Sequence, residues 1–285
     1  MNYFLKHKAI CILIKRKKII MKKIYITSLA LFMSFLISAE TESSMNKSSE
    51  VCIASDDIYI EKEFTKDLVG TFNGKKISYT AALKEKILYE KDNPEAPMAS
   101  FFFTEYLVKS DNKRPVMFIF NGGPGSASLW LHMGVLGPKI VKVPSDASDD
   151  GSPPFNIIDN KLSPLSETDL VFIDPIGTGY SRAAGCHDPE EFWGVNEDPK
   201  IIAEFIRRWI TDNKRWNSPR YILGESYGGI RGPLLVSELR SGSITPIEVN
   251  GLLMVAPASD YQYLVFHPGN NSPHSVSYTH LRAHE

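Results

Sequence analysis

The chain contains 285 residues, of which 43% are hydrophobic and 23% charged; this composition supplies a core and excludes a wholly disordered protein. The formal net charge of -1 provides no overall basic field, so we expect no nucleic-acid partner. The charge is unevenly distributed, because residues 1–39 contain eight basic residues and no acidic ones. A basic start followed by an acidic body predicts a leader joined to a soluble domain.

Residues 21–39 have the three parts of a secretory signal peptide. Two lysines follow Met21, an apolar run extends from Ile24 to Ser38, and Ala39 is a small residue suited to cleavage. The run is shorter than the ~20 residues of a membrane span, so we expect export to the periplasm or medium. Membrane contact is expected only through an uncleaved signal segment. Residues 1–20 are interpreted as an over-extended reading frame.

After the leader, residues 40–57 are rich in Ser, Glu and Lys and predict a flexible tail. Residues 58–270 are expected to form a partial enzyme domain. Outside the leader the cysteines are Cys52 and Cys186. An exported compartment permits a disulfide between them, and two free thiols are an equally good interpretation.

The first part of the domain, up to Lys109, is predicted to be rich in β-strands. Asn73 and Gly74 form a dipeptide typical of hairpin turns, and apolar residues alternate with polar ones on both sides of it. Unbroken apolar runs then predict strands buried on both faces. These runs are Val116 to Phe120, Leu170 to Ile173, Tyr221 to Leu223, and Leu252 to Val255.

Two helical patterns separate the later strands. Pro199 to Trp209 places its apolar residues on one helix face, with Asp198 as the expected N-cap. A second helix is predicted after Ser226, extending to about Leu239. Buried strands that alternate with helices indicate the α/β class, with a mostly parallel central sheet preceded by antiparallel strands.

The candidate nucleophile is Ser226, in the sequence Gly224-Glu-Ser-Tyr-Gly228, which fits the G-x-S-x-G nucleophile elbow. Glycine is needed at both ends because the chain turns sharply between a strand and a helix, where side chains would clash. An apolar strand precedes the motif and a predicted helix follows it, which is the context that the motif requires. The turn presents the serine oxygen at a helix N-terminus, which favours developing negative charge.

A second motif, Asn121-Gly-Gly-Pro-Gly-Ser126, follows the strand that ends at Phe120. An oxyanion hole needs two backbone N–H groups directed at one point. One comes from the residue after the nucleophile, here Tyr227, and the other from a Gly-rich loop after an earlier strand. Neither a Walker lysine nor G-x-G-x-x-G is present, which argues against a phosphate-binding loop.

These two motifs, with a third between them, resemble the serine carboxypeptidase family over roughly residues 70–262. The third motif is Asp174-Pro-Ile-Gly-Thr-Gly-Tyr-Ser181. Members of this family are α/β-hydrolases that remove C-terminal residues from peptides, and some relatives are acyltransferases. The resemblance implies an α/β-hydrolase fold, here with its C-terminal part missing.

The resemblance also implies roles for individual residues. Ser226 would attack the scissile carbonyl, and the N–H groups of Gly123 and Tyr227 would form the oxyanion hole. The substrate's terminal carboxylate would be held by three further residues: Asn121, the N–H of Gly122, and Glu225.

Two of these implied features need qualification. Glu225 can bind a carboxylate only when it is protonated and donates a hydrogen bond. In the family a second glutamate shares this task, and this chain has Val135 at that position. The pocket therefore has another carboxylate anchor or accepts other acyl substrates.

A catalytic Asp and His are not identified in the sequence. Asp260 with His267 or His274 has the right order, but too few residues follow the last strand to bring such a pair to Ser226. Residues 271–285 resemble a translated adapter sequence. The pair His280 and His284 lacks supporting ligands, so we expect no metal and no cofactor.

The sequence thus predicts an exported serine-type carboxypeptidase, present as a fragment without its catalytic Asp and His and acting on a peptide or acyl substrate. The alternatives are a serine carboxypeptidase-like acyltransferase or esterase, and a non-catalytic binding relative. The sequence does not indicate an oligomeric state.

Overall fold

The computed structural model describes residues 59–110, 113–144, 146 and 153–260. The predicted leader, the predicted tail over residues 40–57 and the segment 271–285 lie outside the described residues.

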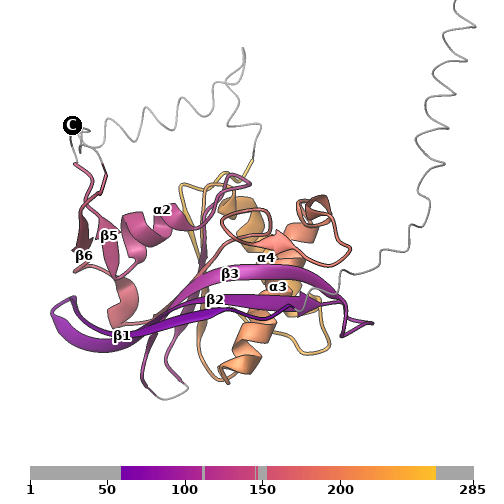
Figure 1. The fold of residues 1–285 in the computed structure, drawn as a ribbon, viewed down its shortest axis with the longest axis horizontal. Coiled ribbons are helices and arrows are strands. Elements are labelled where there is room, and N and C mark those ends of the chain that lie inside the picture. The colour runs from indigo at the N-terminus through magenta and orange to yellow at the C-terminus, as the bar shows by residue number, and fades with distance from the viewer. Residues whose placement is uncertain (1–58, 111–112, 145, 147–152, 261–285) are drawn as a thin grey trace, which may run out of the picture. The chain divides into compact units, whose positions relative to one another are not determined.

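The described chain is built on one mixed sheet with the strand order β1-β2-β3-β7-β4-β9-β10 (Figure 1). β1, β2, β3 and β7 pair antiparallel, whereas β7, β4, β9 and β10 pair parallel; the short β8 pairs with β3. These strands are β1 (Glu63–Phe72), β2 (Lys75–Tyr89), β3 (Pro97–Val108), β4 (Val116–Phe120), β7 (Asp169–Ile173), β8 (Arg182–Ala183), β9 (Arg220–Glu225) and β10 (Gly251–Val255). The predicted α/β architecture, with antiparallel strands first and parallel strands after, is confirmed.

Shorter elements and two long helices connect these strands. A small separate sheet pairs β5 with β6. The elements are α2 (Leu129–Leu131), the π-helical turn η1 (His132–Leu136), β5 (Lys139–Val141), β6 (Ile157–Asp159), the 3₁₀ turns η2 (Pro164–Ser166) and η3 (Pro189–Phe192), α3 (Glu197–Asp212) and α4 (Gly228–Ser241).

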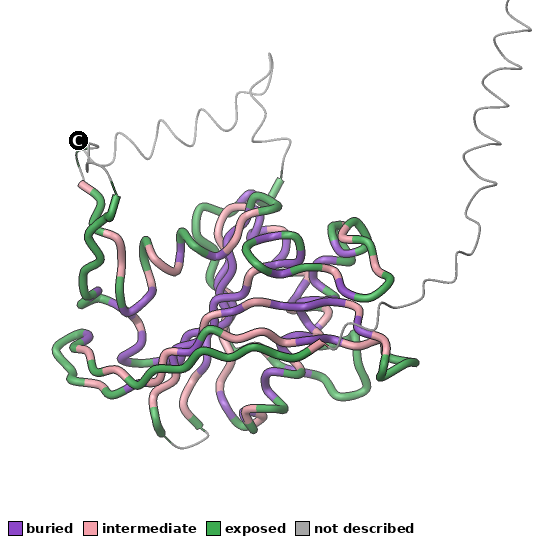
Figure 2. The backbone as a smooth tube through the Cα atoms, viewed as in Figure 1, coloured by how far each residue is buried: buried purple, intermediate pink, exposed green. Residues whose placement is uncertain are grey.

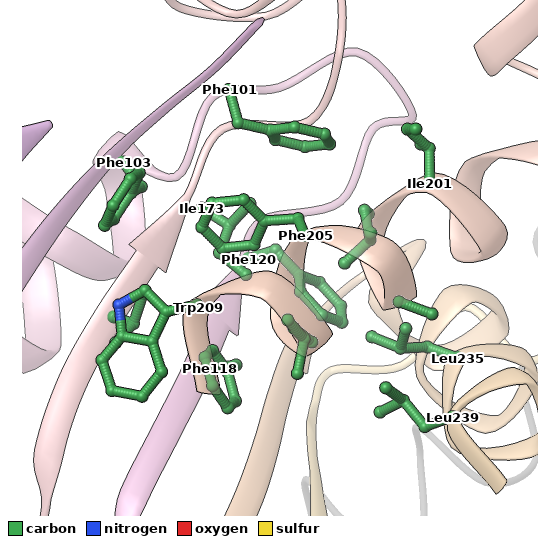
Figure 3. Close-up of a cluster of buried hydrophobic side chains, with 14 of the residues drawn as sticks. Phe101, Phe103, Phe118, Phe120, Ile173, Ile201, Phe205, Trp209, Leu235 and Leu239 are labelled. Carbon is green, nitrogen blue, oxygen red and sulfur yellow. The ribbon is translucent and has the colours of Figure 1, made fainter. Parts of the chain in front are cut away.

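The central strands are buried on both faces, as their unbroken apolar sequences predict. On one face Phe118 and Phe120 of β4 pack against Phe205 and Trp209 of α3 and against Leu235 of α4 (Figure 3). Alternate residues of the same strands belong to a second cluster on the opposite face. Its members are Phe72, Tyr79, Tyr106, Met117, Ile119, Leu131, Leu165, Leu170, Phe172 and Leu223. Figure 2 shows this burial concentrated along the middle of the sheet.

The last strand, β10, differs from this expectation. Its sequence predicted burial on both faces, but Leu253, Met254 and Val255 are each at least 40% exposed. The physical reason is its place at the end of the strand order, with β9 as its one partner in the described part of the chain.

The start of α3 also corrects a prediction. The helix begins at Glu197 with Asn196 as the N-cap, so Asp198 lies inside the first turn instead of capping it. Asp198 is buried and forms an ion pair with Arg231 of α4 at 2.6 Å. Instead of capping α3, this carboxylate binds a side chain that lies 33 positions away along the chain.

At the end of the sheet where β4 and β7 begin, a second buried ion cluster surrounds Asp169, which is fully buried. Its carboxylate accepts hydrogen bonds from Nε of Arg114 at 2.8 Å and from Nη1 of Arg215 at 2.7 Å. The cluster fixes the amino ends of the parallel strands, whereas the candidate site lies beyond their carboxyl ends.

Candidate active site

Ser226 lies at the sharp turn between β9 and α4, with a φ of 56°, in the left-handed region that side chains rarely adopt. Backbone hydrogen bonds hold the turn. The N–H of Ser226 donates to the carbonyl of Val255 in β10 at 3.0 Å, and the carbonyl of Ser226 accepts from the N–H of Gly229 at 2.8 Å. A Cβ at Gly224 would lie 2.8 Å from the carbonyl oxygen of Gly228. This close approach explains the glycine at position 224. A Cβ at Gly228 would come no closer than 3.4 Å to any neighbour, so the clash predicted for the second glycine of the motif is not found.

The Gly-rich loop of residues 121–126, which follows β4, lies directly against this turn. A Cβ at Gly122 would be 2.4 Å from the backbone nitrogen of Tyr227 and 2.9 Å from Cβ of Ser226. Gly123 has a φ of 111°, which only glycine adopts readily. The two motifs found in the sequence are therefore adjacent in space, although about 100 residues separate them along the chain.

The three residues implied to hold a substrate carboxylate are in mutual contact. Glu225 Oε2 accepts hydrogen bonds from Nδ2 of Asn121 at 3.1 Å and from the N–H of Gly122 at 3.3 Å. Asn121 is itself oriented, because its Oδ1 accepts from the N–H of Leu131 at 3.1 Å. One carboxyl group and two donors thus converge beside Ser226.

Val135, at the position of the family's second glutamate, lies on η1 and is 56% exposed. An apolar, exposed side chain there cannot share a proton with Glu225. The pocket therefore has a single carboxyl group among these positions.

The histidines in the described part of the chain form their hydrogen bonds with residues other than Ser226. Nε2 of His132 lies 2.6 Å from the hydroxyl oxygen of Tyr106, and burial lowers the pKa of His132 to about 4. His187 bridges Glu90 and Glu191. Burial lowers its pKa, but its hydrogen bonds to both carboxylates outweigh that effect, so the pKa is raised overall. Neither imidazole contacts Ser226 in the described interactions.

Sequence reasoning missed Arg231, which is 2% exposed and reaches the site from α4. Its Nη1 donates to the backbone carbonyl of Asn121 at 2.8 Å, and its Nε donates to Asp198. Burial raises the pKa of Asp198, and Arg231 opposes that shift. The sequence feature that could have identified Arg231 is its position as a single basic residue among small and apolar residues, one helical turn after Tyr227.

A cavity of about 270 Å³ lies next to the Gly-rich loop. Its walls include Pro124, Gly125, Ile176 and Trp193, and the ion pair Asp198–Arg231 contributes to its lining. The sequence motif beginning at Asp174 supplies part of this wall.

Cys186 is disulfide-bonded, whereas Cys52 lies outside the described residues. No group of three or more His, Cys, Asp or Glu side chains suited to a metal ion occurs in the ranges given above. None of the helices described is both long and apolar enough to cross a bilayer.

The sheet order, the strand–turn–helix at Ser226 and the adjacent Gly-rich loop define an α/β-hydrolase. A family model described as serine carboxypeptidase matches residues 83–267, which is more than half of the chain. The chain belongs to the serine carboxypeptidase family.

Similar proteins include Serine carboxypeptidase-like 2 of Arabidopsis thaliana, which is 28% identical over 167 residues covering 55% of this chain and 36% of the relative. Serine carboxypeptidase-like 9 of the same plant is 28% identical over 59% of this chain and 39% of its own length. The chain thus spans well under half the length of these relatives.

Among solved structures, the chain is similar to Kex1ΔP, a prohormone-processing carboxypeptidase from Saccharomyces cerevisiae. The identity is 21% and the TM-score 0.48, over 70% of this chain and 46% of that one. It is also similar to the peroxisomal α/β-hydrolase Lpx1 of the same yeast, at 11% identity and a TM-score of 0.35, over 73% of this chain and 48% of the other.

Proposed function

We propose that this chain carries the nucleophile and the oxyanion hole of an exported serine-type carboxypeptidase. Ser226 is the nucleophile, and the N–H groups of Gly123 and Tyr227 stabilise the oxyanion. The observation that carries this proposal is the contact between Gly122 and the turn at Ser226, since it places a Gly-rich backbone beside the serine. Family membership provides independent support.

In the proposed reaction the Ser226 oxygen attacks the scissile carbonyl and loses its proton to a base. The negative oxygen that forms is held by the two backbone N–H groups until the amine leaves with a proton. Water then cleaves the resulting acyl-enzyme. We propose a histidine oriented by an aspartate as the base, and neither is assigned among the described residues.

For the substrate we propose peptides with a free C-terminal carboxylate. Nδ2 of Asn121 and the N–H of Gly122 are two donors that already bind a carboxylate oxygen, that of Glu225. A substrate carboxylate would take the place of the Glu225 oxygen, with Glu225 protonated and donating to it.

Val135 favours a second candidate function on the same residues. Because this apolar side chain replaces a carboxyl group of the family's site, an acyltransferase or esterase acting on neutral acyl substrates is the alternative. Offering the enzyme a blocked peptide acid, the corresponding ester, and the ester with an added alcohol distinguishes these reactions. A non-catalytic binding role predicts no product from any of the three.

The nucleophile is tested by covalent labelling with a fluorophosphonate in a version of the protein that includes the proposed aspartate and histidine, followed by peptide mapping. We expect one adduct, on Ser226, that the Ser226→Ala variant abolishes. Ser237→Ala is the matched control, because Ser237 is an exposed serine on the helix that follows the turn. A folded protein that includes the proposed aspartate and histidine and acquires no adduct at Ser226 would contradict the proposal.

A further inference from the structure

Arg231 is held among the elements that build the candidate site, and its guanidinium group is almost completely buried. Its four contacts come from different parts of the chain. Nε donates to Asp198 of α3 at 2.6 Å, and Nη1 donates to the carbonyl of Asn121 at 2.8 Å. The guanidinium carbon also lies 5.1 Å from the ring centre of Phe120 and 5.2 Å from that of Tyr227.

The bond to Asn121 matters because of the geometry of one peptide unit. The carbonyl of Asn121 and the N–H of Gly122 belong to the same planar trans peptide, so they point in opposite directions. Arg231 holds the carbonyl end, and the N–H end points to Glu225 Oε2 at 3.3 Å. Fixing the carbonyl therefore fixes the direction of the N–H.

The ring contacts extend the same restraint to the nucleophile turn. Phe120 directly precedes Asn121, and Tyr227 directly follows Ser226. A guanidinium within 6 Å of a ring is attracted to the ring's face. Arg231 thus contacts residues of both segments that meet at the site. Its ion pair with Asp198 of α3 holds the guanidinium group in place.

We propose that Arg231, held by Asp198, is the positioning residue that aims the Gly122 N–H at the substrate's terminal carboxylate. Arginine suits this role because its planar group donates in several fixed directions at once, whereas a lysine ammonium has no such planar geometry. The inference rests on the proposed carboxylate recognition by Asn121, Gly122 and Glu225, and it adds the residue that sets the direction of one donor.

The test compares binding of a benzyloxycarbonyl dipeptide acid with binding of its C-terminal amide, titrated by NMR at pH 5. Binding is used because it requires no turnover. The wild-type chain is expected to prefer the acid and to shift the Gly122 amide resonance on binding it. Arg231→Lys is expected to reduce the acid-to-amide preference by about tenfold, the scale of one lost hydrogen bond to a charged group.

Two further variants guard against simple loss of folding. Arg231→Met combined with Asp198→Asn removes both charges, so neither is left buried alone. Arg215→Met is the matched control, because Arg215 is also a buried arginine in an ion pair but lies at the opposite end of the strands. The double variant is expected to lose the preference, and the control to keep it.

The cavity beside Arg231 provides a rescue experiment. Because Arg231 lines a space of about 270 Å³, Arg231→Ala leaves room for a small cation. Millimolar methylguanidinium is expected to restore part of the acid preference in this variant and to have no effect on the wild type. If Arg231 acted only by filling volume, a neutral molecule of the same size would restore the acid preference equally well.

The outcomes distinguish failure of the proposed carboxylate recognition from failure of the proposed role of Arg231. A wild-type chain that binds the acid and the amide equally refutes carboxylate recognition, and the role of Arg231 with it. A wild-type preference that persists in folded Arg231→Lys and in the double variant overturns the role of Arg231 alone. An equal loss of the preference in Arg215→Met would also overturn it, because the effect would then be general to buried ion pairs.

Discussion

The contact between the Gly-rich loop and the nucleophile turn can be tested at Gly122. In Gly122→Ala, the new Cβ would start 2.4 Å from the backbone nitrogen of Tyr227 and 2.5 Å from the backbone carbonyl oxygen of Glu225. Real Cβ contacts are essentially never shorter than 3.0 Å, so the segments must separate by at least about 0.6 Å. Both neighbouring atoms belong to the backbone, so no rotamer change can relieve the clash.

The cost follows from this geometry. Overpacking in a core typically costs about 1–3 kcal/mol, and the upper end applies here because backbone must move. A loss of about 3 kcal/mol corresponds to a fall of about 6–12 °C in Tm for a chain of this size. The N–H of Gly122, already 3.3 Å from Glu225 Oε2, would also move out of hydrogen-bond range.

Urea unfolding followed by circular dichroism measures this cost. Gly134→Ala is the matched control, because a Cβ at Gly134 would meet nothing within 4 Å and should change stability by less than about 0.5 kcal/mol. If Gly122→Ala unfolds at the same urea concentration as the wild type, the loop does not lie against the turn and the site described above is wrong.

Two further predictions concern pH. Burial lowers the pKa of His132 to about 4. Below the unfolded pKa of 6.5 the unfolded chain therefore binds a proton at this residue that the folded chain does not, and stability falls as pH decreases from 6.5 to 4. His132→Phe should reduce the loss of stability between pH 7 and pH 4 by about 3 kcal/mol, and an unchanged slope of stability against pH would argue against burial. Hydrogen bonds to Glu191 and Glu90 raise the pKa of His187. The protonated imidazole therefore contributes its full stabilisation of the folded state below the unfolded pKa of 6.5, and this contribution disappears as pH rises through the folded pKa. Thermal unfolding of His187→Gln should therefore show a deficit at pH 5.5 that is absent at pH 9, and equal deficits at both values would exclude an ionic bridge.

Much of the fold was readable from local patterns. The run Val116–Phe120 is β4 residue for residue, and the strand–turn–helix around Ser226 lies where its motif placed it. The hairpin at Asn73 and Gly74 has positive φ at both positions, 49° and 78°. These features depend on neighbours along the chain, such as apolar continuity and the need for glycine at a left-handed position, so the sequence alone specifies them.

Other features depend on partners that are distant in sequence. Asp198 has the composition of a helix cap, yet it pairs with Arg231 because the packing of α3 against α4 brings the two together. The exposure of β10 follows from its position at the end of the strand order and not from its own residues, which are as apolar as those of buried β4.

The features of the candidate site likewise fall into those that the sequence specifies and those that tertiary packing specifies. The sequence by itself determined which residues are chemically able to act: a serine between glycines, a Gly-rich loop, and Asn121 and Glu225 with their polar side chains. Only the tertiary structure decided that Glu225 Oε2 faces the N–H of Gly122 and that Arg231 holds the far end of the same peptide. The physical reason is that a motif fixes local backbone geometry, whereas the direction of a hydrogen bond between segments about 100 residues apart is set by how the sheet and helices pack.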